Sequence, residues 1–217
     1  MSCVREYHFP MTTDHNPDIA LLRSEIAVAA ARMIAEDGAS YDTAKRKAAR
    51  RIMGNTRING EILPDNAEIE NEVRIYNEIF LSNSQPARLL QLRKLALRLM
   101  DELDQFNPYL TGSVLNGTAG EHSNIHLHLF ADSAKDVEIF LLNRNIEYDV
   151  SESPRARGRN QPIETISFIW NNEGVHLTVY GSDDVRGALK PGSGGHPERA
   201  NAALLLQLIE QSILPEG

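Results

Sequence analysis

The chain has 217 residues, enough to bury a sizeable core, and its net charge of −8 argues against a general coat protein for nucleic acid, because phosphate binding depends on clustered lysine and arginine. Its single cysteine, Cys3, excludes an internal disulfide framework, and the N-terminal residues lack the apolar stretch of a secretion signal. The longest apolar run in the first half contains Arg32 and is too short to cross a bilayer, so we expect a cytoplasmic protein with no membrane span.

Helical periodicity dominates the first part of the chain. Apolar residues recur every three or four positions in the stretch that ends at Gly38, and glycine is typical of a helix end. Asp42 is expected to cap a second helix that runs through AKRKAARRIM, and Asp65 is expected to begin a third. A helical region is therefore predicted over residues 1–84.

The segment SNSQP at residues 82–86 combines turn formers with a proline that suits the first turn of a new helix, so a domain boundary is expected there. The elements predicted after it are a helix over about residues 87–104, strands in YLTGSVL and NIHLHLFA, a helix in DSAKDVEIFLLNR, a strand in IEYDV, a hairpin in ETISFIWNNEGVHLTVYG that turns at Asn171 to Gly174, and a helix over about residues 197–213. This mixed order predicts an α+β domain over residues 85–217.

The most informative stretch runs from Tyr109 to Phe130. A pair formed by Gly112 and Ser113 closes a short apolar run, and an alternating strand begins after Ser123. This layout resembles the polymerase-beta-type nucleotidyltransferases, whose signature is Gly-Ser, a spacer, and two carboxylates placed two residues apart on a strand. The resemblance implies a nucleotidyltransferase-like mixed β-sheet core with flanking helices.

The resemblance also implies a role for each matching position. The turn at Gly112 and Ser113 would present N–H groups and a hydroxyl to a nucleoside triphosphate, with Ser123 beside it. The positions of the three magnesium-binding acids are occupied by Asn124, His126 and His176. Because Mg²⁺ prefers oxygen ligands and accepts imidazole poorly, two-metal transfer chemistry is expected to be lost.

A second interpretation gives the histidines a positive role. His126 and His128 alternate on one strand face, and His176 would face them from a paired strand, so three imidazoles could bind Zn²⁺ or another transition metal. The alternative is a set of hydrogen-bonded histidines beside a polar cleft, which the generic spacing favours. The acids that could still supply one carboxylate are Glu121, Asp132, Glu164 and Glu173, and their spacing selects none of them.

Two basic clusters could bind phosphates. The cluster on the second predicted helix could bind the phosphates of a nucleic acid. It comprises Lys45, Arg46, Lys47, Arg50 and Arg51. Helical geometry is expected to spread these five around the helix, which favours a solvated surface. The second cluster lies on a loop before the hairpin, where it could meet a triphosphate tail or form a mobile charged loop, and it comprises Arg155, Arg157 and Arg159.

The chain also resembles, over most of its length, proteins named UDP-N-acetylmuramate–alanine ligase, including the segments AKRKAARR, GSVLNGTAGEHS and HLHLFAD. The sequence contains no GxxxxGK[ST] phosphate loop, so the residues do not support that activity. Three functions therefore stay open. They are a catalytically degenerate nucleotidyltransferase-like protein that binds a nucleotide or phosphate, an active transferase with substitute ligands or a histidine-based metal site, and an interaction or nucleic-acid-binding module.

Overall fold

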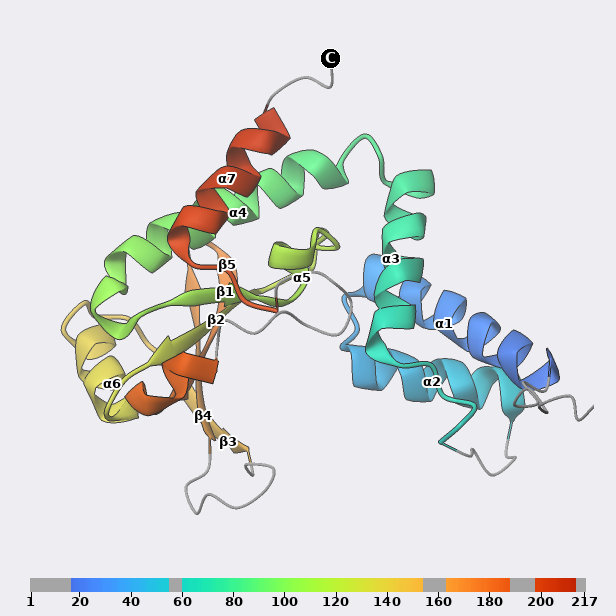
Figure 1. Cartoon of the computed structure of the whole chain (residues 1–217), viewed down its shortest axis with the longest axis horizontal. Helices are drawn as coiled ribbons and strands as arrows, with labels where there is room; N and C mark the ends of the chain where they lie inside the picture. The colour runs from blue at the N-terminus through green and yellow to red at the C-terminus, as the bar shows by residue number, and fades with distance from the viewer. Residues whose placement is uncertain (1–16, 55–59, 154–162, 188–197, 214–217) are drawn as a thin grey trace, which may run out of the picture.

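The computed structural model describes residues 17–54, 60–153, 163–187 and 198–213 (Figure 1). Helices α1 (Pro17–Asp37), α2 (Tyr41–Met53) and α3 (Asn66–Phe80) form one group, in which α1 packs on both α2 and α3. The hydrophobic cluster between these helices consists of Ile26, Ala27, Ala30, Ala31, Ala44, Ala48, Ala49, Ile69 and Val73. The three predicted helices of the first part are therefore confirmed.

Local capping explains where these helices begin and end. Asp65 caps α3 in a reciprocal capping box with Glu68, as its position in the sequence predicts. Helix α2 is capped by Ser40, whose hydroxyl accepts a hydrogen bond from the Thr43 amide. The prediction that Asp42 caps this helix is therefore wrong. Asp42 lies in the first turn, where it forms an ion pair with Arg46.

The remainder of the described chain is an α+β arrangement, as predicted. The elements are α4 (Gln85–Glu102), η1 (Asp104–Phe106), β1 (Tyr109–Thr111), α5 (Gly112–Asn116), β2 (Ile125–Phe130), α6 (Ala134–Leu142), β3 (Asp149–Ser153), β4 (Ile163–Trp170), β5 (Glu173–Tyr180), η2 (Ser182–Gly187) and α7 (Ala202–Ile213). The sheet has the order β1-β2-β5-β4-β3, in which β2 and β5 are parallel and the other neighbouring pairs are antiparallel.

Two turns differ from their predicted form. The expected strand YLTGSVL ends at Thr111, because Gly112 adopts a left-handed backbone (φ +69°) and the next residues form the short helix α5. The hairpin between β4 and β5 turns on Asn171 and Asn172, both with positive φ, which is the two-residue turn that matches strand twist. Glu173 consequently belongs to β5 and not to the turn.

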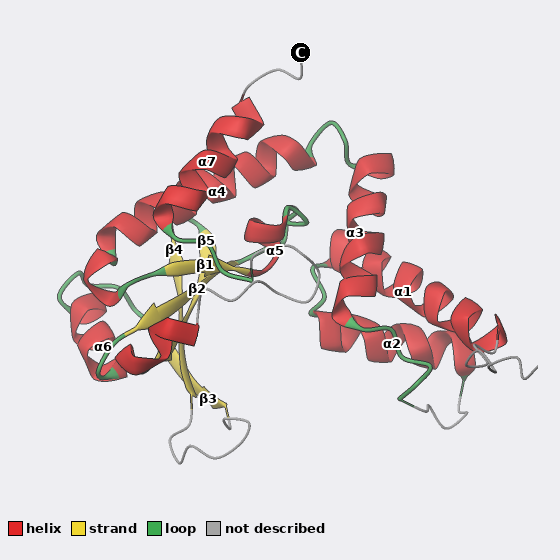
Figure 2. Cartoon of the chain, in the orientation of Figure 1, coloured by secondary structure: helices red, strands yellow, loops and turns green. Residues whose placement is uncertain are grey.

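The two faces of the sheet have different surroundings. Along β2 and β5, buried residues such as Leu127 and Leu177 alternate with residues that are partly or fully accessible to solvent. The buried face joins α4, α6 and α7 in the second hydrophobic cluster, and α4 and α7 lie side by side on it (Figure 2). We call the other face the open face; on β2 and β5 it carries His126, His128, Phe130, His176, Thr178 and Tyr180.

Hydrogen bonds from α3 and from the first residue of α4 hold the loop after α5. The Asn77 amide donates to the Thr118 carbonyl at 3.2 Å, and the Gln85 amide donates to the carbonyls of Gly117 and Ala119 at 2.9 and 2.8 Å. Helices α3 and α4 therefore fix the position of the loop that precedes β2. Within the described ranges, no helix has both the length and the apolar character needed to span a membrane.

Candidate functional site

Strand register brings the positions predicted from the nucleotidyltransferase resemblance together on the open face. Thr111, the last residue of β1, pairs with His126, and His126 pairs in turn with His176 on β5. The two imidazole rings stack with centroids 4.7 Å apart. A Cβ added at Gly112 would lie 3.8 Å from Cδ2 of His126, so the glycine backbone lies against that ring. We call Gly112, Ser113, Asn124, His126 and His176 the sheet site.

Both ring nitrogens of His176 have side-chain partners. Its Nε2 lies 3.0 Å from Nδ2 of Asn124, and its Nδ1 lies 2.8 Å from the hydroxyl of Ser167 on β4. A neutral imidazole donates from one nitrogen and accepts at the other, which satisfies both contacts at once. Burial lowers the pKa of His176 and so favours this neutral form.

Asn124 reaches His176 because β5 has a glycine beneath it. A Cβ at Gly174 would come within 2.4 Å of the Asn124 side-chain oxygen, which is closer than real side chains approach one another. The amide therefore occupies space that only glycine leaves open. Gly174 thus sets the position of Asn124 and, through it, the orientation of the His176 ring.

A buried arginine supports α5 from behind. Arg93 of α4 donates to the carbonyls of Val114 and Leu115, at 3.1 and 3.2 Å, and to the Ser212 hydroxyl at 3.2 Å. Burial lowers the pKa of this guanidinium, and a cation at the carboxyl end of a helix is favoured by the helix dipole. Arg93 thereby positions the helix that begins at the Gly112–Ser113 turn.

A second arginine fixes the start of β5. Arg88 of α4 donates to both carboxylate oxygens of Glu173, at 2.5 and 2.7 Å, and to the backbone carbonyl of Glu121 at 3.1 Å. The side chains of Arg88 and Glu173 are only 15% and 11% exposed, so this pair is largely shielded from water. The contact ties α4 to the residue that precedes Gly174.

His128 lies two residues along β2 from His126, among aromatic rings and a cation. Its ring meets Tyr180 edge to face at 4.9 Å, and the Arg199 guanidinium lies 5.3 Å from the Tyr180 centroid. Burial lowers the pKa of His128 to about 4, and the positive charge of Arg199 and the nearby His126 lower it further. His128 is therefore neutral at pH 7.

His126 is also neutral at pH 7, although its side chain is more exposed to solvent than that of His128. Its pKa is also lowered to about 4, first by desolvation and then by the neighbouring His176. The His126 ring is the more exposed of the two, so its uncharged nitrogens are accessible from solvent. At neutral pH both rings offer uncharged hydrogen-bonding atoms to the open face.

The depressed pKa of His128 predicts acid sensitivity. The unfolded chain takes up a proton near pH 6.5 but the folded chain only near pH 4, so stability is complete above about 6.5 and falls as the pH drops through this window. We expect His128 to account for a loss of about 2–3 kcal/mol by pH 4. Urea titrations across the window should show a flatter pH dependence for His128→Gln. An equal slope for the variant and the wild type would contradict this assignment.

The other predicted site residues have different surroundings. The Ser123 hydroxyl accepts a hydrogen bond from the Gly120 amide at 3.0 Å, which closes the turn before β2. The loop arginines Arg155, Arg157 and Arg159 lie outside the described residues.

None of the four acids considered from the sequence belongs to the sheet site. Glu173 pairs with Arg88, Asp132 accepts from the Ser182 hydroxyl at 2.6 Å, and Glu121 is exposed near Arg88. Glu164 shares its strand face with the buried Ile166, on the side away from His176. The absence of carboxylates at the three acid positions is therefore not compensated by any of these four.

The histidines do not form a metal-ligand set. Among the residues that the structure describes, no three His, Cys, Asp or Glu side chains are grouped so that they could hold a metal ion. Both nitrogens of His176 are already bonded to Asn124 and Ser167. His176 therefore corresponds to the alternative of a hydrogen-bonded histidine, and His126, His128 and His176 are not grouped as metal ligands.

Sequence reasoning missed Ser167, Gly174 and the supporting arginines. Ser167 could have been found, since a two-residue turn at Asn171 and Asn172 places it opposite His176. Gly174 and Arg93 had no such signal, because their roles depend on contacts made by distant segments.

Comparison of the chain with protein families, with curated proteins and with solved structures finds no match.

Proposed function

We propose that the protein has a nucleotidyltransferase-like core that binds a nucleotide or another phosphate-bearing ligand at the sheet site and does not transfer it by two-magnesium chemistry. The observation that carries the proposal is the contact of Gly112 with His126, whose ring stacks on His176. The residues at the family's glycine turn and at its acid positions thus lie next to one another on a solvent-accessible strand face.

Hydrogen-bond donors at this place support an anionic ligand. Thr111 occupies the N-cap of α5, but its side chain makes no capping bond, and its hydroxyl instead donates to the His126 carbonyl at 3.3 Å. The first-turn amides of α5 therefore have no side-chain acceptor at the cap. The exposed and uncharged His126 ring lies against Gly112, so it adds hydrogen-bonding nitrogens at the same place.

The chemistry of the side chains supports binding without metal-dependent transfer. Asn124 and the two histidines carry no negative charge, so nothing in the sheet site neutralises a pair of magnesium ions. For the same reason, the site does not repel a phosphate. Loss of the acids is therefore compatible with a phosphate ligand and unfavourable for phosphoryl or nucleotidyl transfer.

Thermal denaturation with ATP, GTP, CTP or UTP, in EDTA and in Mg²⁺, tests the proposal. At one hundred times its dissociation constant, a bound ligand adds about 2.7 kcal/mol, which raises the melting temperature by several degrees. We expect this stabilisation with at least one nucleotide in EDTA. No shift with any nucleotide or with pyrophosphate would contradict binding, and transfer of a radiolabelled nucleotide would contradict the loss of catalysis.

A matched pair of glycine variants locates the ligand. Gly174→Ala pushes the Asn124 amide away from His176, and we expect affinity to fall about fivefold to tenfold, equivalent to one hydrogen bond. Gly120→Ala is the control, because a Cβ at Gly120 meets nothing within 4 Å. Equal affinities for the two variants, measured by calorimetric titration, would place the ligand elsewhere.

A further inference from the structure

The exposed side of α2 carries a one-sided basic surface, which we call the basic face. It consists of Arg46, Lys47, Arg50 and Arg51, all exposed, while Ala44, Ala48 and Ala49 are buried. At 3.6 residues per turn these four cations span roughly 140° of the helix, on the side away from the alanines. Lys45 projects on the opposite side, between Ala48 and Ala49, and donates to Asn66. The five cations are thus spread around the helix, but four of them share one exposed side.

Most of these cations have no carboxylate partner. Arg46 pairs with Asp42, but both side chains are more than 70% exposed, so the pair contributes little. In the part of the chain covered by the structure, the side chains of Lys47, Arg50 and Arg51 form no ion pair or hydrogen bond. Three cations within two helical turns are thus available to an external anion.

The arginines on the other two helices of this region, α1 and α3, all form ion pairs. Arg23 pairs with Glu68, Arg32 with Glu36, and Arg74 with Glu70, so every described arginine of α1 and α3 has a carboxylate partner. The whole chain is acidic, with a net charge of −8. A solubilising surface would mix both signs, and a helix dipole would favour cations only in the last turn of α2. The dipole accounts for Arg50 and Arg51, which lie in the last turn, but neither reason accounts for Arg46 and Lys47.

We propose that the basic face binds the phosphate backbone of a nucleic acid. Guanidinium groups match phosphate oxygens in a bidentate geometry, and three of the four cations are arginines. A membrane surface fits less well, because the alanines of α2 are buried and its Ile52 and Met53 pack against the same cluster, so the helix offers no exposed large apolar residue to insert into lipid. An acidic peptide fits less well, because the basic face has no exposed apolar residue to anchor one.

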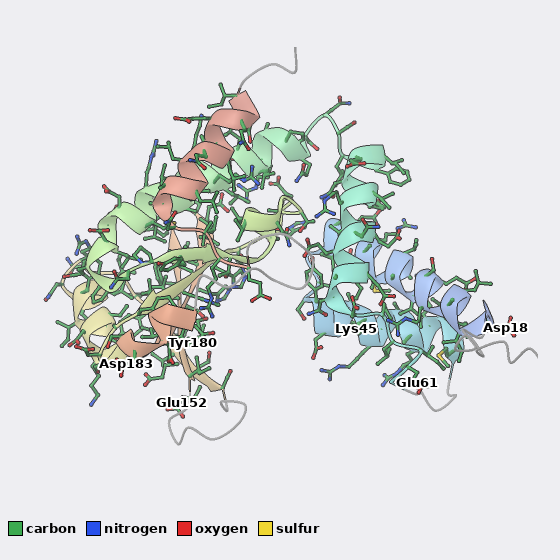
Figure 3. All side chains as sticks on the ribbon, in the orientation of Figure 1. Asp18, Lys45, Glu61, Glu152, Tyr180 and Asp183 are labelled. Atoms are coloured by element: carbon green, nitrogen blue, oxygen red, sulfur yellow. The ribbon has the colours of Figure 1, made fainter. Side chains whose placement is uncertain are left out.

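The basic face is separate from the sheet site. Figure 3 shows Lys45 on α2 and Tyr180 at the end of β5 in different parts of the molecule. Nucleic-acid binding through α2 is therefore independent of a ligand at Gly112, and either proposal can fail without the other. Because the chain as a whole has a net charge of −8 and the basic face would contact phosphates only, we expect binding to be weak and independent of base sequence.

Fluorescence anisotropy of the full chain with a labelled single-stranded RNA tests the inference. With three to four phosphate contacts to a single strand, log affinity should fall with log salt with a slope of about −2.5, so that affinity drops roughly 30-fold between about 50 and 200 mM. Arg46→Gln/Arg50→Gln and Lys47→Gln/Arg51→Gln should each roughly halve the slope. Glutamine keeps the helix propensity of these exposed positions, so both variants should fold.

The control is Arg32→Gln/Arg74→Gln, which makes the same change in net charge on α1 and α3. We expect its salt slope to equal that of the wild type. The proposal is overturned if the wild type binds no RNA at low salt, if the control loses as much affinity as the α2 variants, or if polyglutamate binds as tightly as RNA.

Discussion

Replacing Arg88 with methionine is expected to lower the free energy of unfolding by about 3–5 kcal/mol, the usual effect of removing one partner of a shielded ion pair. Arg88 makes two hydrogen bonds to Glu173, and both side chains are almost fully covered. The variant leaves the Glu173 carboxylate without its counter-charge. Urea denaturation monitored by circular dichroism measures the loss.

Two controls separate this effect from the loss of surface charge. Arg74→Met breaks a helical pair with Glu70 that is more exposed to water, and it should change stability by less than about 0.5 kcal/mol. The double variant Arg88→Met/Glu173→Met should be more stable than Arg88→Met, because neither charge is then left alone. If Arg88→Met costs no more than Arg74→Met, the pair does not stabilise the start of β5.

Gly38→Ala is expected to be the second most damaging substitution, with a loss of about 2–4 kcal/mol. Gly38 ends α1 with a left-handed backbone (φ +67°), and its amide donates to the Ile34 carbonyl. A Cβ there would lie 2.5 Å from Cβ of His122, an atom that cannot move without the backbone of the loop. The variant should therefore strain the contact between the helical region and the loop before β2.

Gly117→Ala provides a control for the backbone term. Gly117 follows α5 in the left-handed region (φ +89°, ψ 4°), and a Cβ there would come no closer than 3.8 Å to another side chain, which is ordinary van der Waals contact. We expect Gly117→Ala to cost only the left-handed strain, about 1–2 kcal/mol. Equal losses for the two alanine variants in urea denaturation would show that the His122 contact contributes nothing.

Local sequence patterns predicted most of the elements, because their causes lie within a few residues. The capping box at Asp65 needs only a glutamate three positions later, and the alternation in β2 needs only its own side chains. Two local predictions were wrong because a neighbouring residue determined the backbone instead. Ser40 caps α2 two residues before Asp42, and the left-handed Gly112 converts the end of a predicted strand into α5.

The sheet site could be predicted in its residue types but not in its geometry. The resemblance in the segment around Gly112 marked His126 and His176 as related positions, yet their stacking requires the parallel pairing of β2 with β5 across the intervening α6, β3 and β4. The pairing of Arg88 with Glu173 joins residues 85 positions apart, and no periodicity reveals it.

By itself, the sequence determined the helices, the strand alternation and the substitution of Asn124, His126 and His176 for acids, because propensity, capping and side-chain chemistry act over short distances. Only the tertiary structure decided that Ser167 and Asn124 occupy both nitrogens of His176, and that Lys47, Arg50 and Arg51 of α2 have no carboxylate partner among the described residues. Those properties depend on which distant segments are close in space. Long-range packing of the sheet and of the three helices sets them, and no local pattern encodes them.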